Sequence, residues 1–274
     1  MNIWSWRRSK TASPAIFSTF AQARTACGDG YADPDLIRLI TAKSRSLYKN
    51  SIPFPAATQG LGTLIAIPTC AAWRKAGEPI TVLDLGGGYG YHARLVRQIF
   101  PFIPVKWAIV ETGPLLEFSK EFETKDIKFF ASVKDASRWL GPIHLVHASS
   151  SLQYFENPAR EATSLAALKA CFVLIQRAPF ALKEPFAVIQ QSLLSDNGPG
   201  PWPDDPSVAH ITDRDRTIRY VAHYANRSEV LSRFTGSGYD VMVHLEGESS
   251  EIAAACPVVH GDMWLLQRKI KSRP

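Results

Sequence analysis

A run of glycines after an apolar segment is the strongest chemical signal in the sequence. Asp84-Leu85-Gly86-Gly87-Gly88-Tyr89-Gly90 closes the apolar run that begins at Ile80, and a helical pattern follows it. Glycines let the backbone turn sharply and approach a ligand closely, and the helix after them offers free N–H groups and the positive end of its dipole. The pattern predicts a ligand site; the plain alternative is a tight strand-to-helix turn that binds nothing.

Glu111 stands where the next apolar run, Val105–Val110, ends. One ligand that fits this pattern is S-adenosylmethionine. Glu111 is then predicted to accept hydrogen bonds from the two ribose hydroxyls of that cofactor, and Asp84 to offer an acceptor near its ammonium group. An acidic residue at this distance also occurs in dinucleotide folds, and Gly88-Tyr89-Gly90-Tyr91-His92-Ala93 formally matches GxGxxA. A nicotinamide cofactor is therefore the alternative, although that match begins three residues after the strand and leaves Asp84 and Gly86 without a role.

Four residues near the same edge of the predicted sheet are candidates for catalysis or acceptor binding. His92 follows the glycines, His147 ends a predicted fourth strand, and Tyr154 lies just beyond with Gln153. Each has a structural alternative: a buried strand histidine for His147, helix capping or cofactor packing for His92, and core packing for Tyr154. Arg177 is either a substrate clamp or a structural ion-pair partner.

Short apolar runs alternate with helical patterns from residue 80 onward, as repeated βα units require. The last two runs have no helical pattern between them, so they are predicted to pair as an antiparallel hairpin. The fold class is therefore α/β, a Rossmann-like seven-stranded mixed sheet with an antiparallel C-terminal hairpin. Its predicted strands are Ile80–Leu85, Val105–Val110, Ile127–Phe130, Ile143–Ala148, Phe172–Gln176, Tyr239–Leu245 and Asp262–Arg268.

Residues 1–79 are predicted to form an N-terminal tail and a helical cap ahead of this core. Asp33 can cap a helix whose apolar residues follow a helical stripe. Pro53, Pro55 and Pro68 are predicted to break the helical stretch into pieces, because proline lacks a backbone N–H.

Residues 80–274 are predicted to form the core, with a lid or insertion at about 181–225. The chain is proline-rich and polar from Pro179 to Asp215, which is too long for a bare connection in a compact domain. A stretch of this kind is usually a lid or a binding loop.

Four segments resemble, in order, the signatures of one family: 82–90, 106–111, 148–154 and 177–180. That family consists of class-I S-adenosylmethionine-dependent methyltransferases defined by sequence profile, often associated with surface-polysaccharide or other secondary biosynthesis. The resemblance covers roughly Asp29 to Ile270. It implies S-adenosylmethionine as cofactor and methyl transfer to an oxygen or nitrogen of a small-molecule or glycan acceptor.

Positions at the carboxyl edge of the predicted sheet indicate which residues could contact the cofactor and which could act on the acceptor. Many class-I enzymes have an acid after the third strand for the adenine amine, whereas this chain has Ala131-Ser132-Val133, so Ser132 is the candidate there. That missing acid and the lack of an obvious base keep a non-catalytic binding protein on the same fold as an alternative. The cofactor-binding candidates are Asp84, Gly86, Gly87, Gly88, Gly90, Glu111, Ser132 and Ser149, and the catalytic candidates are His147, Tyr154 and His92.

Composition bounds the remaining possibilities. The 274 residues are 46% hydrophobic and 20% charged, as in an ordinary globular protein, and the formal net charge is +6. The basic residues are scattered, and the densest cluster lies at Arg7, Arg8 and Lys10 in the predicted tail, so no nucleic-acid partner is expected. Trp4 and Trp6, with Phe17 and Phe20, suggest a surface contact with a membrane; a docking or disordered tail is the favoured alternative.

The chain is expected to be cytoplasmic, without stable membrane association. It has no apolar stretch of secretory type near its start and none approaching the length of a membrane span. Cys27, Cys70, Cys171 and Cys256 are widely separated, without the spacing of a zinc site or the density of a disulfide scaffold. The histidines show no metal-ligand spacing either, so no metal is predicted.

Overall fold

The structure is a computed structural model that describes residues 15–27, 30–52, 60–251 and 257–269. Several residues discussed above lie outside these ranges: Trp4, Trp6, Arg7, Arg8, Lys10, Pro53, Pro55 and Cys256.

The central sheet has the strand order β10-β11-β6-β5-β2-β3-β4, and β9 pairs with β11 beyond the end of β10. Strands β2 to β6 are parallel, whereas β11 runs antiparallel to β6, β9 and β10. The predicted mixed sheet and its antiparallel C-terminal hairpin are confirmed, but the sheet has eight strands in the described ranges and not seven, because β10 adds a short strand at the edge of β11. The strands are β2 (Ile80–Leu85), β3 (Val105–Val110), β4 (Ile127–Phe130), β5 (Leu145–Ser149), β6 (Phe172–Ala181), β9 (Tyr239–Leu245), β10 (Glu248–Glu251) and β11 (Pro257–Arg268).

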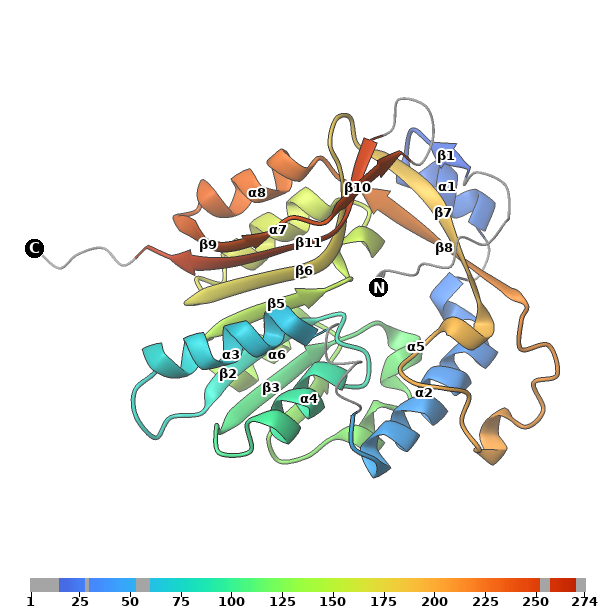
Figure 1. Ribbon diagram of the computed structural model, residues 1–274, viewed down its shortest axis with the longest axis horizontal. Helices are drawn as coiled ribbons and strands as arrows, with labels where there is room; N and C mark the ends of the chain where they lie inside the picture. Colours follow the sequence, from blue (N-terminus) through green and yellow to red (C-terminus); the bar gives the residue numbers. More distant parts are fainter. Residues whose placement is uncertain (1–14, 28–29, 53–59, 252–256, 270–274) are drawn as a thin grey trace, which may run out of the picture.

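Helices cover both faces of this sheet (Figure 1). Helices α3 (Leu61–Trp73) and α4 (Tyr91–Ile99) pack on one face, and α6 (Val133–Leu140), α7 (Pro158–Ala166) and α8 (Arg227–Thr235) pack on the other. Strands β2, β3, β5 and β6 are buried on both faces, which explains why they read as continuous apolar runs.

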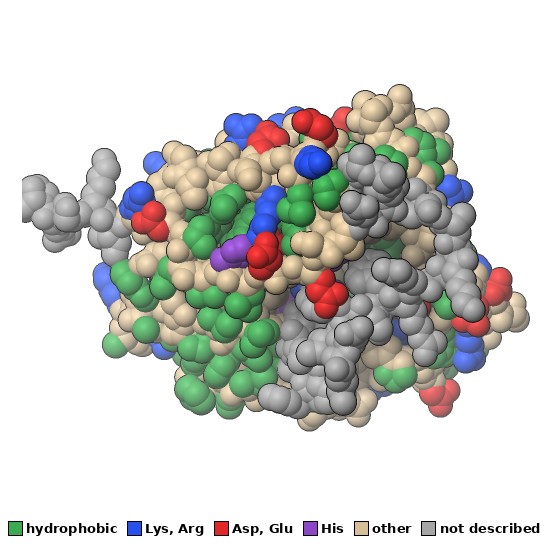
Figure 2. Space-filling view, turned by 45° about the horizontal axis from the view of Figure 1, so that its top comes forward, with side chains coloured by type: hydrophobic (Ala, Val, Ile, Leu, Met, Phe, Trp, Pro, Cys, Tyr) green, Lys and Arg blue, Asp and Glu red, His purple; other side chains and the backbone are tan. Residues whose placement is uncertain are grey.

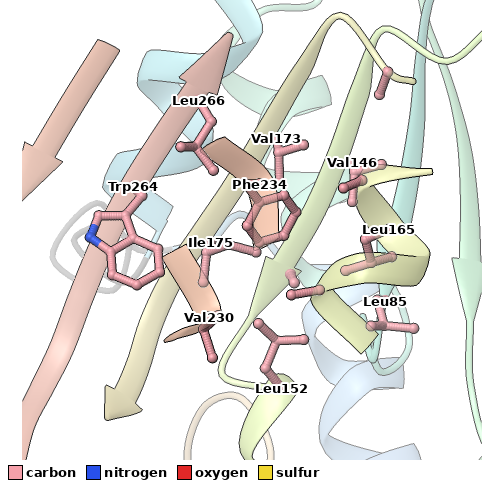
Figure 3. Close-up of a cluster of buried hydrophobic side chains, with 14 of the residues drawn as sticks. Leu85, Val146, Leu152, Leu165, Val173, Ile175, Val230, Phe234, Trp264 and Leu266 are labelled. Atoms are coloured by element: carbon pink, nitrogen blue, oxygen red, sulfur yellow. The ribbon is translucent and has the colours of Figure 1, made fainter. Parts of the chain in front are cut away.

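Alternation along the strands decides which side chains meet which helices. Leu83 and Leu85 of β2 belong to the apolar cluster under α6, α7 and α8, where Phe234 and Leu165 contribute from the helices (Figure 3). Val82 belongs to the cluster under α3 and α4. Asp84, which shares the face of Val82, therefore points into the α3 and α4 layer.

A second, three-stranded sheet lies beside the first, in the order β1-β7-β8. Strands β7 (Phe186–Leu193) and β8 (Thr217–Tyr224) form an antiparallel hairpin, and β1 (Ile16–Phe17) pairs with the outer edge of β7. The hairpin occupies most of the stretch predicted as a lid or insertion. That stretch is therefore not a bare loop, because buried and exposed residues alternate along β8 as in a half-buried strand.

The N-terminal part contributes helices as well as β1. Helix α1 (Phe20–Cys27) packs on β7 and β8, and α2 (Pro34–Lys49) begins at Asp33, whose Oδ1 accepts the N–H of Leu36 as predicted for a cap. Phe17 and Phe20 thus belong to the second sheet and its helix. None of the helices in the described ranges is both long and apolar enough to cross a membrane.

Pro68 does not end a helix, contrary to the sequence-based expectation. It lies inside α3, on the exposed side, and the helix continues to Trp73. On that side the carbonyl that loses its N–H partner can turn to water, which makes an interior proline tolerable.

Candidate ligand site at the carboxyl edge of the central sheet

The glycine loop joins β2 to α4 at the carboxyl edge of the sheet. Gly86, Gly88 and Gly90 have φ angles of +69°, +56° and +83°, where other residues are strained. A Cβ added to Gly86 would lie 2.6 Å from Cβ of Ser151, so that glycine allows two loops to pack together. A Cβ added to Gly88 would meet no atom of the described residues within 4 Å. Gly88 therefore borders open space that a ligand can enter.

Glu111 lies directly beyond β3 and faces this loop. Its Oε1 accepts the N–H of Gly88 at 2.7 Å, and its Oε2 accepts the N–H of Thr112 at 3.1 Å. Burial raises the pKa of Glu111, while the two backbone donors lower it in part. The strand-end acid and the glycine loop are thus brought together as predicted from the parallel sheet, with the carboxylate bound to a loop amide.

Asp84 is fully buried beneath the loop. Its Oδ1 accepts a hydrogen bond from Nδ1 of His147 at 2.6 Å, and its Oδ2 accepts the indole N–H of Trp107 at 2.9 Å. A Cβ at Gly87 would collide with this carboxylate, so the side chain lies against the underside of the loop. Each carboxylate oxygen already accepts a hydrogen bond from the protein. Neither oxygen is therefore left without a partner for the ligand ammonium that was predicted to lie near Asp84.

His147 is also fully buried, on the strand next to Asp84. Its Nε2 lies 2.9 Å from Oγ1 of Thr63 in α3 and 3.2 Å from Nε2 of Gln176 at the end of the parallel part of β6. Gln176 also donates to Thr63 at 2.9 Å. The arrangement matches the alternative reading of His147 as a satisfied strand histidine.

His92 joins the same network from the first turn of α4. Its Nδ1 lies 3.2 Å from Oγ1 of Thr63, and its ring centroid lies 4.7 Å from that of His147. Burial lowers the pKa of His92 well below the usual histidine value, and His147 and Arg177 add to the effect. His92 is therefore neutral at neutral pH.

Tyr154 lies farther from the glycine loop, between the two sheets. Its ring meets those of Tyr31 and Tyr220 edge to face at 5.0 and 5.8 Å, and its hydroxyl donates to Oε1 of Gln190 at 3.4 Å. Burial raises the pKa of Tyr154. This packing agrees with the alternative of a core tyrosine.

The two serine candidates differ in what their hydroxyls do. Ser132 caps α6: its Oγ accepts the N–H of Asp135 at 3.1 Å and donates to the carboxylate of Asp135 at 2.7 Å. Ser149 follows the opposite pattern, since its buried hydroxyl has no partner among the described residues, and neither has that of Ser151. Because Ser151 lies against Gly86, unpaired donors border the glycine loop on the side away from Glu111.

Thr63 is the member of the buried network that sequence reasoning missed. It forms hydrogen bonds with both His92 and His147, yet it lies in a segment predicted only as part of a helical cap. Asp84 and His147 could be aligned from the strand pattern alone. The helix that covers them could not, because its register on the sheet depends on tertiary packing.

The described ranges contain no group of three His, Cys, Asp or Glu side chains placed to hold a metal ion. Cys27, Cys70 and Cys171 are free thiols, and burial raises the pKa of the first two.

Comparison with known proteins gives structural likeness only. No family model matches the chain, and no curated protein matches its sequence. CalS10, a SAM-bound amino pentose methyltransferase from Micromonospora echinaspora, shares 12% identity at a TM-score of 0.47 over 77% of this chain and 91% of its own. DesVI of Streptomyces venezuelae shares 14% identity at a TM-score of 0.47 over 78% of this chain and 92% of its own. An S-adenosylmethionine-dependent methyltransferase of Clostridium acetobutylicum shares 8% identity at a TM-score of 0.45 over 76% of this chain and 91% of its own.

Proposed function

We propose that this protein is a methyltransferase that transfers the methyl group of S-adenosylmethionine to an oxygen or nitrogen of a small molecule or glycan. The observation that carries the proposal is the pairing of Gly88, open on one side, with Glu111 at the end of the adjacent strand. The antiparallel β11, inserted between β6 and β9, supports it over a dinucleotide enzyme, whose strands are classically all parallel.

The residues at the loop suit the parts of this cofactor. Glu111 can exchange its bond with the Gly88 amide for bonds from two ribose hydroxyls, which leaves that amide free to donate to the ligand. The unpaired hydroxyls of Ser149 and Ser151 can take up polar groups of the methionyl part. A sulfonium supplies an already activated methyl group, so the protein mainly has to align the acceptor and exclude water.

His92 is the residue best suited to remove a proton from a hydroxyl or ammonium acceptor. We assign the hydrogen of Thr63 to Nε2 of His147, so that the Thr63 oxygen accepts from Gln176 and from Nδ1–H of His92. In this pattern, the lone pair of His92 lies on Nε2. The lowered pKa keeps that lone pair free at neutral pH.

Calorimetry with S-adenosylhomocysteine tests the donor half. Wild-type protein is expected to bind it, and Gly88→Arg is expected to abolish binding because the side chain fills the open space beside the loop. Gly141→Arg is the matched control, since Gly141 also has a positive φ and open space but lies at the end of α6. Absence of binding to wild type, or equal loss in both variants, contradicts the proposal, and saturable NAD binding would favour the oxidoreductase.

A binding protein without turnover is the second candidate, because His147 and Asp84 are wholly buried and occupied by one another. Purified protein that binds S-adenosylhomocysteine but transfers no labelled methyl group to any fraction of a small-molecule and glycan extract would favour it.

A further inference from the structure

Arg177 occupies a strained position in β6, directly after Gln176 of the buried network. Its φ is +56°, a conformation that non-glycine residues rarely adopt. It lies in β6 where the pairing with β11 shifts register, between Ile175↔Trp264 and Ala178↔Asp262. A bulge of this kind re-aims a side chain, and strained residues persist where the surrounding fold enforces them.

Ser150 is strained in the same place. Its φ is +54°, and its N–H donates to the carbonyl of Gln176, the residue before Arg177. Two non-glycine residues in the left-handed region thus adjoin across β5 and β6. Apart from Lys169, they are the only such residues in the described ranges.

Arg177 has no carboxylate partner in the described part of the chain. It appears in no ion pair or hydrogen bond there. The groups that act on its pKa electrostatically are three tyrosines, Tyr154, Tyr91 and Tyr31, which raise it. Burial lowers the pKa of Arg177. By contrast, Arg227 binds the buried carboxylate of Asp262 at 2.7 Å. A partly buried cation without an anion is destabilising unless a ligand supplies one.

Arg177 lines a small cavity of about 30 Å³, whose lining also includes Ser150, Gln153, Gln190, Tyr224 and His260. Hydrogen bonds already orient part of this lining: Gln153 donates to Ser150, and Gln190 donates to Tyr224 at 2.9 Å. The space suits one or two water-sized groups, such as the oxygens of an anion, and not a whole acceptor.

We propose that Arg177 binds an oxyanion of the acceptor, a carboxylate or phosphate, and so selects acidic small molecules or acidic sugars. The proposal rests on the proposed function, because it places the acceptor beside the glycine loop. An arginine fork matches carboxylate and phosphate oxygens in two parallel hydrogen bonds, which gives both affinity and orientation.

The test compares D-galacturonate, D-galactose 6-phosphate and neutral D-galactose by thermal unfolding, with and without S-adenosylhomocysteine. We expect one or both acidic sugars, but not galactose, to raise the Tm of wild type. The two acids distinguish a carboxylate from a phosphate source. In Arg177→Met, the affinity for the acid is expected to fall about tenfold to a hundredfold. An equal shift with galactose, no shift with either acid, or an unchanged shift in the variant would overturn the proposal.

Ligand-free stability separates a binding arginine from a structural one. Arg177→Met is expected to unfold at the same or a higher temperature than wild type, whereas the control Arg227→Met leaves Asp262 buried without its partner and unfolds at a lower one. A lowered Tm in Arg177→Met contradicts the proposal. So does a tenfold loss of S-adenosylhomocysteine binding in that variant, which would assign Arg177 to the cofactor. If wild type binds no S-adenosylhomocysteine, the proposed function fails, while the sugar arms without it still test Arg177.

Discussion

His92 and His147 belong to one hydrogen-bond network on the same face of the central sheet. Their surroundings indicate different roles. His147 has hydrogen-bond partners at both ring nitrogens and a fully buried side chain. Its bond to Asp84 holds that carboxylate beneath the glycine loop, which is a structural task. His92 uses Nδ1 toward Thr63, and its second nitrogen is the base in the proposed reaction.

The lowered pKa of His92 predicts the pH profile of methyl transfer. A base is lost only when pH falls through its own pKa, so activity should stay level as pH falls through about 6.5, where an ordinary histidine would already be half protonated. His92→Gln should reduce turnover about a hundredfold. Rates measured with a saturating acceptor across this pH range test the prediction.

The control for that profile is the binding of S-adenosylhomocysteine. His92→Gln should bind it as wild type does, because the variant keeps a polar side chain beside Thr63. A wild-type rate that halves near the ordinary histidine pKa, or full activity in the variant, would remove His92 from the reaction.

The sequence predicted the contact between the glycine loop and Glu111 better than it predicted the surroundings of Thr63 and Arg177. Gly88 and Glu111 follow strands in a parallel sheet, so their proximity is a consequence of topology. Thr63 and Arg177 obey no such rule. One depends on how α3 seats on the sheet, and the other on a bulge in the pairing with β11.

At the scale of elements, a buried lysine is one of the residues that attach the connection between β7 and β8 to α2. Lys43 of α2 donates to the carbonyl of Ser195 at 2.7 Å, and burial lowers its pKa to about 8. The carboxylate of Asp196 opposes this effect and raises the pKa in part. The connection that follows β7 is therefore attached to α2 by a charged group in an unfavourable environment.

Lys43 predicts a rise of stability with pH. The unfolded chain keeps the Lys43 proton to about pH 10.5, whereas the folded protein releases it near pH 8. Between these values the unfolded state binds more protons, so the free energy of unfolding increases with pH on account of this group. Below pH 8 the unfavourable contribution is fully present. Urea unfolding of wild type and Lys43→Met from about pH 7 to 9.5 measures the difference.

The matched control is Lys49→Met, at the exposed end of the same helix. It should change stability equally at all these pH values, whereas the gap between wild type and Lys43→Met should change in favour of wild type as pH rises. A gap independent of pH would mean that Lys43 is charged in the folded protein throughout the range.

The predicted boundaries of helices and strands were wrong where tertiary packing outweighed local sequence preferences. Pro68 was expected to break a helix, but its position on the exposed side of α3 lets the helix continue. The hairpin of β7 and β8 was hidden because prolines and glycines dominate the connection between the two strands. The parallel strands were placed well, since burial on both faces leaves an unbroken apolar run.

The whole molecule consists of two sheets with separate covering layers. The glycine loop and Glu111 belong to the central sheet. Helix α1 covers the outer face of β7 and β8, where Ala23 and Cys27 contact Ala187 and Ile189. The tyrosine cluster around Tyr154 lies where the two sheets meet. The second sheet is thus placed to shape the acceptor side of the proposed site.

This division predicts that the covering layer of the second sheet can be disrupted without loss of cofactor binding. Ala23 is fully buried, so Ala23→Glu places an unpaired charge against β7 and β8 and should lower the free energy of unfolding by at least about 2 kcal/mol. Ala26→Glu, on the exposed side of α1, should change it little. Affinity for S-adenosylhomocysteine should match wild type in both variants, while transfer to the acceptor falls in Ala23→Glu alone. Loss of cofactor binding together with stability in Ala23→Glu would show instead that the two sheets act as one cooperative unit around the donor edge.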